Sequence, residues 1–146
     1  MKLKIVNKSN NPTPAYQTSG SAGMDICANL EFPVHVQPGS KALIPTGIYM
    51  AIEEGYECQV RPRSGMAAKY GITVLNSPGT IDSDYRGEIV VILHNTSGVS
   101  YLVNHGDRIA QLVFAKVERA EVEQFVTLAA LEPTDRGEGG FGSTGK

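Results

Sequence analysis

The stretch that indicates the fold reads Leu43-Ile44-Pro45-Thr46-Gly47-Ile48-Tyr49. Apolar residues with a preference for strands lie on both sides of a proline and a glycine. Proline cannot donate to the ladder of a central strand, and glycine inside a strand often marks a bend. Pro45 and Gly47 therefore demote part of this run to an edge strand or a bend.

The same alternation of short apolar runs and turn residues continues along the chain. Gly and Pro signals separate runs of about five to nine residues that are rich in Val, Ile and Tyr. Many short strands are typical of sandwiches, jelly rolls and barrels, so we predict an all-β fold, a jelly-roll-like β-barrel or sandwich. The predicted strands lie around Leu3–Val6, Met24–Ala28, Ala42–Met50, Tyr56–Val60, Gly71–Leu75, Glu88–His94, Gln111–Val117 and Val122–Leu128.

One stretch, Ser64-Gly65-Met66-Ala67-Ala68-Lys69-Tyr70-Gly71, departs from this pattern. Ser64 can serve as an N-cap, good helix formers follow it, and Gly71 favours a helix stop. We predict one short helix here.

Length and composition limit the class of protein. The chain has 146 residues and a net charge of −2, which suits one domain that is not a general nucleic-acid binder. A small anionic ligand remains compatible, because a few local cations can form a positive pocket. Cys27 and Cys58 form no C-x-x-C pair, which indicates buried thiols in a reducing compartment. With no signal peptide or membrane-length apolar run, we expect a cytoplasmic protein with no membrane partner.

Three motifs carry polar residues in otherwise apolar surroundings. Asp25 follows a small-residue turn; it is either a turn aspartate bonded to its own backbone or a functional carboxylate. Arg61 and Arg63 precede Ser64-Gly65, which is either an anion site or a solvated arginine pair with an ordinary cap. Gln111 lies in an apolar strand, where its amide needs hydrogen-bond partners from a neighbouring strand or from a ligand.

A fourth motif, Asn76-Ser77-Pro78-Gly79-Thr80-Ile81-Asp82-Ser83-Asp84-Tyr85-Arg86-Gly87, concentrates charge between glycines. Asp82 and Asp84 share one side if the segment is extended. A carboxylate here could orient or deprotonate water, and a pair could hold Mg²⁺. The alternative is a polar β-turn. The pattern does not continue as an EF-hand loop, so we exclude that calcium site.

The fifth motif is the Gly-rich end of the chain, Arg136 to Lys146. It imitates a Walker loop and a dinucleotide fingerprint, but no strand or helix follows, so both interpretations fail. The segment can wrap phosphates with backbone N–H groups, and Phe141 suits stacking on a base. A disordered tail is the alternative. We predict a single β domain over residues 1–133 and a flexible C-terminal arm over residues 134–146.

Taken together and in this order, the five motifs resemble the signature motifs of the trimeric deoxyuridine triphosphatase (dUTPase) family, across nearly the whole chain. The matching residues are Ala22–Asp25, Arg61–Ala67, Gly79–Gly87, Gly106–Leu112 and Arg136–Gly145.

This resemblance implies a homotrimer with active sites at subunit interfaces, where the tail of one subunit closes over a site built by others. It also implies a Mg²⁺-assisted hydrolysis of dUTP to dUMP and pyrophosphate, which limits uracil incorporation into DNA and supplies dUMP for dTMP synthesis. Asp82 would activate the water that attacks the α-phosphorus. Mg²⁺ would bind through phosphates and waters with no direct protein ligand, and Asp25 and Asp84 would organise its site.

The resemblance further implies the substrate contacts. Tyr85 would pack against the deoxyribose, and Asn76 would read the uracil edge together with the hairpin that begins at Gly79. Phe141 would stack on the uracil from the tail. The expected substrate-binding residues are Arg63, Ser64, Gly65, Asn76, Gly79, Thr80, Ile81, Tyr85, Gln111, Arg136, Phe141, Gly142, Ser143 and Thr144.

Three other functions are weighed against this one. A dCTP deaminase-like enzyme would cut a C–N bond and release ammonia, but the segment around Asp82 and the tail with Phe141 fit a dUTPase better. A catalytically silent nucleotide-binding module would not need an intact Asp82. A plain structural β domain leaves the Gly-rich tail without a purpose.

Overall fold

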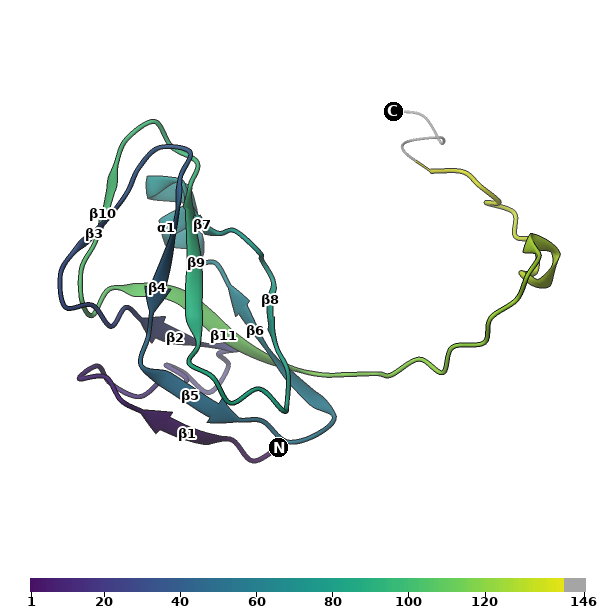
Figure 1. The fold of residues 1–146 in the computed structure, drawn as a ribbon, viewed down its shortest axis with the longest axis horizontal. Coiled ribbons are helices and arrows are strands. Elements are labelled where there is room, and N and C mark those ends of the chain that lie inside the picture. The colour runs from purple at the N-terminus through teal and green to yellow at the C-terminus, as the bar shows by residue number, and fades with distance from the viewer. Residues whose placement is uncertain (141–146) are drawn as a thin grey trace.

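The computed structural model describes residues 1–140 and consists of short strands with one α-helix (Figure 1). Its strands are β1 (Lys4–Asn7), β2 (Gly23–Cys27), β3 (Val34–Val36), β4 (Lys41–Pro45), β5 (Ile48–Ala51), β6 (Tyr56–Arg61), β7 (Ile72–Val74), β8 (Gly79–Ile81), β9 (Val90–Asn95), β10 (Tyr101–Val103) and β11 (Arg108–Lys116). Helix α1 spans Ser64–Tyr70, and a 3₁₀ turn spans Leu128–Ala130.

The strands pair antiparallel in four small sheets. The largest has the order β2-β11-β6-β8, and a second has the order β4-β9-β7. Two ribbons, β1-β5 and β10-β3, complete the body. Most neighbours in these sheets are far apart in sequence, and short strands that cross over between sheets are typical of a jelly roll. The predicted all-β, jelly-roll-like fold is confirmed.

One hydrophobic core joins all four sheets. Along β2 the burial alternates, so Met24 and Ile26 point inward while Asp25 points to the other face. This is the period of two that a strand imposes on its side chains. The core residues include Ile26, Val36, Ile44, Ile48, Cys58, Val60, Val91, Val103 and Leu112, and Met66 joins α1 to them.

The opening stretch forms the end of β4 and the start of β5. Strand β4 is an edge of its sheet and Pro45 is its last residue, as the sequence predicts. Gly47 has a φ of 70°, and a side chain there would meet Ser9 at 2.8 Å. The Glu88 carboxylate accepts hydrogen bonds from the backbone N–H groups of Thr46 and Gly47, at 3.1 and 2.7 Å. The bend is thus fixed from outside by a residue distant in sequence.

Helix α1 ends where the sequence predicts and begins one residue differently. Gly71 adopts the left-handed conformation, with a φ of 65°, and its N–H donates to the Ala67 carbonyl at 3.1 Å. The prediction that Ser64 is the N-cap is wrong: the cap position is Arg63, and no side chain caps the helix. The Arg63 side chain binds elsewhere, as described below.

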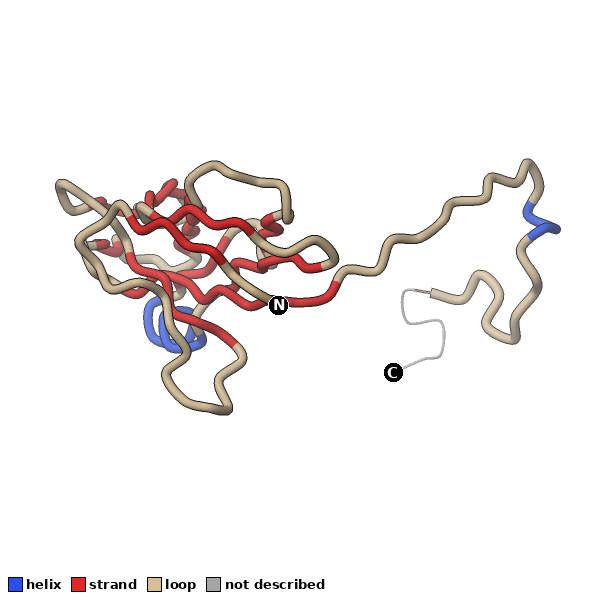
Figure 2. Tube along the Cα trace, turned by 90° about the horizontal axis from the view of Figure 1, so that it is seen from below, coloured by secondary structure: helices blue, strands red, loops and turns tan. Residues whose placement is uncertain are grey.

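The strand predicted over Val122–Leu128 is wrong. After β11 the chain leaves the body, and residues 118–140 extend away from it, as Figures 1 and 2 both show. Val122 and Val126 are 85% and 98% exposed. The apolar run has no neighbouring strand within the described residues, so its pattern alone does not produce a strand. The sequence analysis does not predict the three-residue strands β3, β8 and β10.

We call residues 118–140 the arm. Within the described part of the chain, the backbone hydrogen bond from Val117 N to Gly55 O (3.0 Å) is the last that joins this end of the chain to the body. The hydrogen bonds made further on are local turns. The division of the chain into residues 1–133 and 134–146 stays a prediction.

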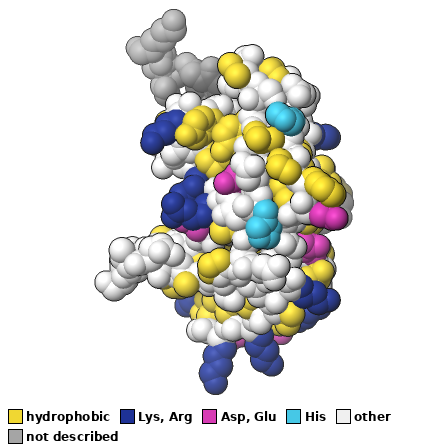
Figure 3. Space-filling model, turned by 90° about the vertical axis from the view of Figure 1, so that its left-hand side faces the viewer, with side chains coloured by type: hydrophobic (Ala, Val, Ile, Leu, Met, Phe, Trp, Pro, Cys, Tyr) yellow, Lys and Arg dark blue, Asp and Glu magenta, His cyan; other side chains and the backbone are white. Residues whose placement is uncertain are grey.

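Apolar side chains remain on the surface of the body as well as on the arm. Figure 3 views the side that carries β3 and β10 and shows apolar groups spread over it among polar ones. Phe32, Val99 and Leu102, which lie on or beside this ribbon, are 72%, 74% and 41% exposed. No helix among residues 1–140 is both long and apolar enough to cross a membrane.

The two cysteines are free thiols. Cys58 is fully buried, and burial raises its pKa to about 12. Cys27 is half-buried, and burial, followed by the negative charge of Asp25, raises its pKa as well. The prediction of buried thiols therefore holds for Cys58 and in part for Cys27.

Candidate functional site

The Asp25 carboxylate is the centre of a polar cluster on the outer face of the largest sheet. One oxygen accepts from Arg63 Nε at 3.1 Å and from Gln111 Nε2 at 3.3 Å. The other accepts from Arg108 Nη1 at 3.2 Å. The side chains of Asp25 and Arg63 are 11% and 25% exposed, so their ion pair is shielded from solvent more than a surface pair is; Arg108 is 57% exposed. The alternative interpretation of a turn aspartate bonded to its own backbone does not apply.

A β-bulge brings Arg108 to this face. Asp25 and Gln111 are direct partners across β2 and β11, so their side chains share a face. Arg108 is three residues before Gln111 and would point to the opposite face in a regular strand. The register shifts between Arg108 and Ala110, where Ile109 and Ala110 are both buried. A bulge of this kind re-aims the side chains on one side of it.

Arg63 links this cluster to α1. Its Nη1 group donates to the Arg108 carbonyl at 3.0 Å while its Nε donates to Asp25. The guanidinium is thereby held in one orientation, with donors left over for a ligand. Ser64 and Gly65 follow directly and are exposed. Four of the predicted substrate-binding residues therefore lie at or next to Asp25: Arg63, Ser64, Gly65 and Gln111.

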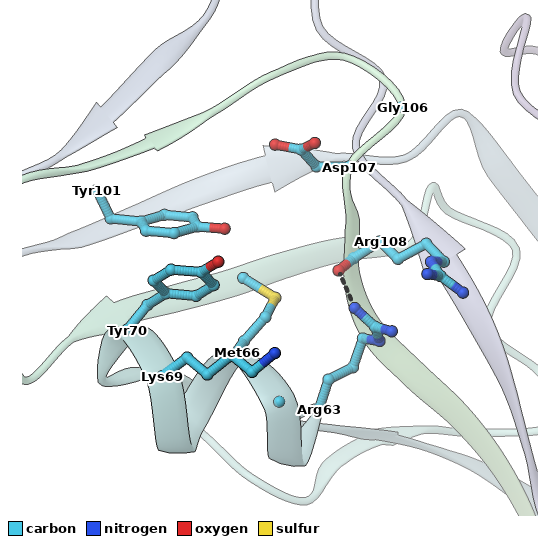
Figure 4. A pocket seen from close by; sticks show the side chains of 9 residues that line it. Arg63, Met66, Lys69, Tyr70, Tyr101, Gly106, Asp107 and Arg108 are labelled. Atoms are coloured by element: carbon cyan, nitrogen blue, oxygen red, sulfur yellow. Dashed lines mark hydrogen bonds between the residues drawn. The ribbon is translucent and has the colours of Figure 1, made fainter.

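A cavity of about 390 Å³ adjoins this cluster between α1 and the turn before β11 (Figure 4). It extends from Arg63 and Gly65 past Lys69 to a pair of tyrosine rings, Tyr70 and Tyr101, whose centroids are 5.2 Å apart. Burial, with a smaller contribution from the negative charge of Asp107, raises the pKa of the Tyr101 hydroxyl. Tyr101 therefore stays a neutral hydrogen-bond donor at neutral pH.

The second group of predicted residues lies on β8 and in the segment that connects it to β9. Asp82-Ser83-Asp84-Tyr85 forms a turn in which Tyr85 N donates to Asp82 O at 3.2 Å, so the extended arrangement considered for the two aspartates is not present. Asp82 and Asp84 are exposed and line a cavity of about 420 Å³ with Thr80 and Ser83. Exposed carboxylates on a hydrogen-bonded turn are able to hold water or a hydrated cation.

Tyr85 is held over the end of this segment. Its hydroxyl donates to the Glu88 carbonyl at 3.0 Å, and its ring lies so close to Gly87 that a side chain there would overlap the hydroxyl. The ring remains 43% exposed. Arg86 folds back to donate to the carbonyls of Ser83 and Tyr85, at 2.7 and 2.8 Å. The glycine and the arginine therefore fix Tyr85 with one side open to a ligand.

Asn76 lies at the start of the same segment, close to β8. A side chain at Gly79 would come within 3.0 Å of the Asn76 amide nitrogen. Gly79 is buried and Asn76 is exposed, so the amide sits against the strand backbone with part of it open. Thr80 and Ile81 complete β8 and pair with Gln59 and Cys58 of β6.

Asp82 and Arg63 lie at opposite ends of β6. Ile81 pairs with Cys58, and Asp82 and Glu57 line one cavity, which places Asp82 beside the start of β6. Arg63 follows the other end of this strand. At about 3.3 Å per residue, the run from Glu57 to Arg63 spans up to about 20 Å. The described residues of one chain therefore do not bring Asp82 next to the Asp25 cluster.

The tail residues divide between described and undescribed parts of the chain. Arg136 lies on the arm and donates from Nε to the Gly139 carbonyl at 2.7 Å. Phe141, Gly142, Ser143 and Thr144 lie outside the described residues, and their roles stay predictions. Within residues 1–140, no three His, Cys, Asp or Glu side chains gather as a metal-binding group.

Sequence reasoning did not select Arg108 or Lys69 as site residues. Arg108 was visible in its motif, but regular alternation places it away from Gln111, and the bulge is not apparent from the residues. In the sequence, Lys69 has the features of a lysine in the last turn of a helix, where its charge interacts favourably with the helix dipole. Only the packing of α1 against the turn before β11 shows that Lys69 lines a cavity.

Known proteins resemble this chain over nearly its whole length. The dUTPase family model matches residues 9–145. A deoxyuridine 5'-triphosphate nucleotidohydrolase of Finegoldia magna is 53% identical over 145 residues and covers 99% of both chains. One from Cytophaga hutchinsonii is 54% identical over 144 residues, covering 99% of this chain and 92% of its own length.

A solved structure shares the fold as well. The Staphylococcus bacteriophage 80alpha dUTPase, in a mutant form with dUpNHpp, has a TM-score of 0.86 at 26% identity and covers 99% of each chain. The match extends through all five motifs and includes both groups of polar residues described above. The chain therefore belongs to the dUTPase family.

Proposed function

We propose that this chain hydrolyses dUTP to dUMP and pyrophosphate by attack of a water molecule on the α-phosphorus. The observation that carries the proposal is the cluster in which Asp25 orients Arg63, Arg108 and Gln111 beside Ser64 and Gly65. Such a set of preorganised donors matches the charge of a polyphosphate, because phosphoryl transfer depends mainly on positioning and electrostatics.

The Asp25 cluster would hold the phosphates that leave. Arg63 is fixed by Asp25 and by the Arg108 carbonyl, and its remaining N–H groups can bind phosphate oxygens in the fork geometry that suits them. The backbone of Ser64 and Gly65, together with the Gln111 amide, adds neutral donors. Because Asp25 already holds these groups in place, little reorganisation is needed when charge moves onto the pyrophosphate.

Asp82 would hold and activate the attacking water. It is exposed, lies on a hydrogen-bonded turn and lines a cavity large enough for water and a ligand. Tyr85, three residues further on the same segment, would pack against the deoxyribose and exclude a 2′-hydroxyl. Asn76 and the backbone from Gly79 through Thr80 and Ile81 would read the uracil edge, since fixed donors and acceptors reject a wrong base strongly.

The residues present fit a magnesium ion held by the substrate. The Asp25 carboxylate is already occupied by two guanidinium groups and an amide, and such a carboxylate suits contacts to the ion's waters better than direct ligation. Asp25 and Asp84 would organise those waters, which agrees with the habit of Mg²⁺ to keep several waters and bind phosphates. When bound, the ion would neutralise charge on the pyrophosphate.

The complete site would form in a homotrimer. Asp82 and Arg63 lie at opposite ends of β6, yet both must approach the same α-phosphorus and its neighbours. A second copy can supply the segment with Asp82 to the Asp25 cluster of the first, and a closed ring repeats this contact at each interface. The C-terminal residues of a further copy would close over the bound nucleotide with Arg136, Phe141, Gly142, Ser143 and Thr144.

The proposed reaction is tested by assaying dUTP, UTP, dCTP and dTTP with and without Mg²⁺, and by measuring pyrophosphate and nucleoside monophosphate. We expect release of pyrophosphate from dUTP alone, and its loss with EDTA. In D82N we expect a loss of at least about 100-fold in kcat, in the range of general-base catalysis. The matched control is E31Q, which neutralises an exposed carboxylate outside both groups of residues.

Other outcomes would point elsewhere. Ammonia from dCTP would indicate a deaminase, and binding of dUTP without turnover would indicate a silent module. An active D82N variant would remove the role given to Asp82 but leave dUTP hydrolysis in place. We also propose a cytoplasmic location, which the two free thiols support because such thiols persist in reducing compartments.

A further inference from the structure

The cavity beside the Asp25 cluster extends beyond the residues that are proposed above to bind the phosphates. It begins at Arg63 and Gly65 and continues along α1 to Lys69 and Tyr70. Gly65 and Lys69 are four residues apart, so they share one face of the helix. A ligand bound at Gly65 would therefore meet Lys69 about one helical turn further on.

Lys69 contributes a charge to this cavity that has no partner within residues 1–140. Arg63 and Arg108 both pair with Asp25, at 3.1 and 3.2 Å. Lys69 makes no hydrogen bond or ion pair in the same part of the chain. Figure 4 shows its ammonium group and the Arg63 guanidinium directed into the same space. An anion bound there would contact the Arg63 guanidinium, which is held in one orientation, and the Lys69 ammonium group, which can adjust its position.

The rest of the lining suits an anion that also accepts hydrogen bonds. The hydroxyls of Tyr70 and Tyr101 lie on the side of the cavity opposite Arg63 (Figure 4). The one acidic residue of the lining, Asp107, accepts from the backbone N–H of Asn104 at 2.8 Å. Three cations and one carboxylate give the lining a positive balance, which focuses attraction on a small anion.

We propose that Lys69 binds the terminal phosphate of the substrate and so makes the site prefer a nucleoside triphosphate over its mono- and diphosphate. This rests on the proposed function. Asn76 and Tyr85, assigned to the nucleoside, do not line the cavity. With Asp82 supplied by a second copy, the phosphate chain runs from that residue toward Arg63 and Gly65, and its far end reaches the part of the cavity that holds Lys69.

A purely structural role for Lys69 makes a different prediction. A lysine in the last turn of a helix interacts favourably with the helix dipole and stabilises the helix slightly. In that case removing the charge would lower the stability of α1 slightly and would not change the preference between ligands.

The test measures binding of dUMP, dUDP and a non-hydrolysable imido analogue of dUTP to wild type, K69M, K69R and K41M by calorimetry, at fixed Mg²⁺. K69M keeps the apolar stem and removes the charge, and K41M does the same to an exposed lysine on β4. We expect K69M to weaken the triphosphate analogue roughly 10- to 100-fold, the loss typical of one hydrogen bond to a charged group. The affinity for dUMP should change less than about twofold, and K69R should recover part of the loss.

The possible results separate the two proposals. Unchanged binding of the analogue by K69M, or an equal loss for dUMP and the analogue, would overturn the role of Lys69 while wild-type hydrolysis of dUTP still supports the proposed function. If wild type releases no pyrophosphate from dUTP, the proposed function fails and the role of Lys69 fails with it. In steady-state assays the expected K69M defect lies mainly in KM, because the terminal phosphate is remote from the bond that breaks.

Discussion

Single side chains in this protein act through the neighbours that hold them. The Asp25 carboxylate makes no hydrogen bond to its own backbone. It instead accepts hydrogen bonds from two guanidinium groups and an amide and so orients them. Tyr85 has one side closed by Gly87 and its hydroxyl bound by the Glu88 carbonyl. In each case a residue that touches no substrate determines where a substrate-binding group points, and such support accounts for much of the accuracy of a site.

Replacing Gly87 by alanine tests the placement of Tyr85. The added methyl would overlap the Tyr85 hydroxyl, so the ring must move although the backbone at this position tolerates alanine. We expect the preference for dUTP over UTP, measured as the ratio of kcat/KM values, to fall roughly tenfold, with a small change in the unfolding temperature. G98A is the control, because a side chain there meets nothing within 4 Å. Wild-type discrimination in G87A would argue against the role of Tyr85.

At this scale the sequence predicts residue types well and their geometry poorly. The motifs predict Asp25, Arg63 and Gln111 as site residues, and the structure brings them together. The pattern does not predict Arg108, because the bulge at Ile109 reverses the alternation that a sequence pattern assumes. Asp82 and Asp84 were expected on one side of an extended segment, but local hydrogen bonds fold this segment into a turn.

The elements of the fold follow from local patterns where a neighbour exists to complete them. The strands β2, β6 and β11 were predictable from their alternation, and each has a partner in the largest sheet. The run Val122–Leu128 carries a similar pattern and forms no strand, because within the described residues nothing lies beside it. Strand formation depends on pairing, which a single segment does not encode.

Helix α1 depends on the glycine that ends it. Gly71 has a φ of 65°, and a side chain there would come within 3.0 Å of Ser97 Cβ. Alanine would therefore add a steric cost to the cost of the left-handed conformation. We expect G71A to lower the free energy of unfolding by about 2–4 kcal/mol, measured by urea denaturation.

A second glycine isolates the two contributions to this effect. Gly39 has nearly the same conformation, with a φ of 70°, and a side chain there would meet nothing within 4 Å. G39A should lose only the conformational part, about 1–2 kcal/mol. Equal losses in G71A and G39A would show that the contact with Ser97 relaxes without cost.

The whole molecule keeps the two groups of site residues apart, which makes assembly testable through function. R63A and D82N should each be inactive as pure proteins. In trimers assembled from an equal mixture, about a quarter of the sites would receive an intact Arg63 from one subunit and an intact Asp82 from another. We expect the mixture to recover about that share of wild-type activity when pyrophosphate release is measured.

The control for this experiment mixes two variants of the same residue, D82N and D82A. No chain in that mixture supplies an intact Asp82, so the mixture should stay inactive. If R63A and D82N fail to complement although mixed trimers form, each site draws both groups from the same chain and the interface proposal is wrong.

If the proposed trimer forms, the arm would distinguish assembled chains from unassembled ones in the cell. It leaves the body at Val117 and exposes Val122, Phe125, Val126 and Leu128 to water, without a hydrogen bond back to the body within the described residues. Extended apolar segments of this kind are what chaperones bind and proteases cut first. An arm laid against another subunit would escape both. Cellular quality control would thus remove the unassembled chains. The protein that remains in the cell would consist of assembled chains.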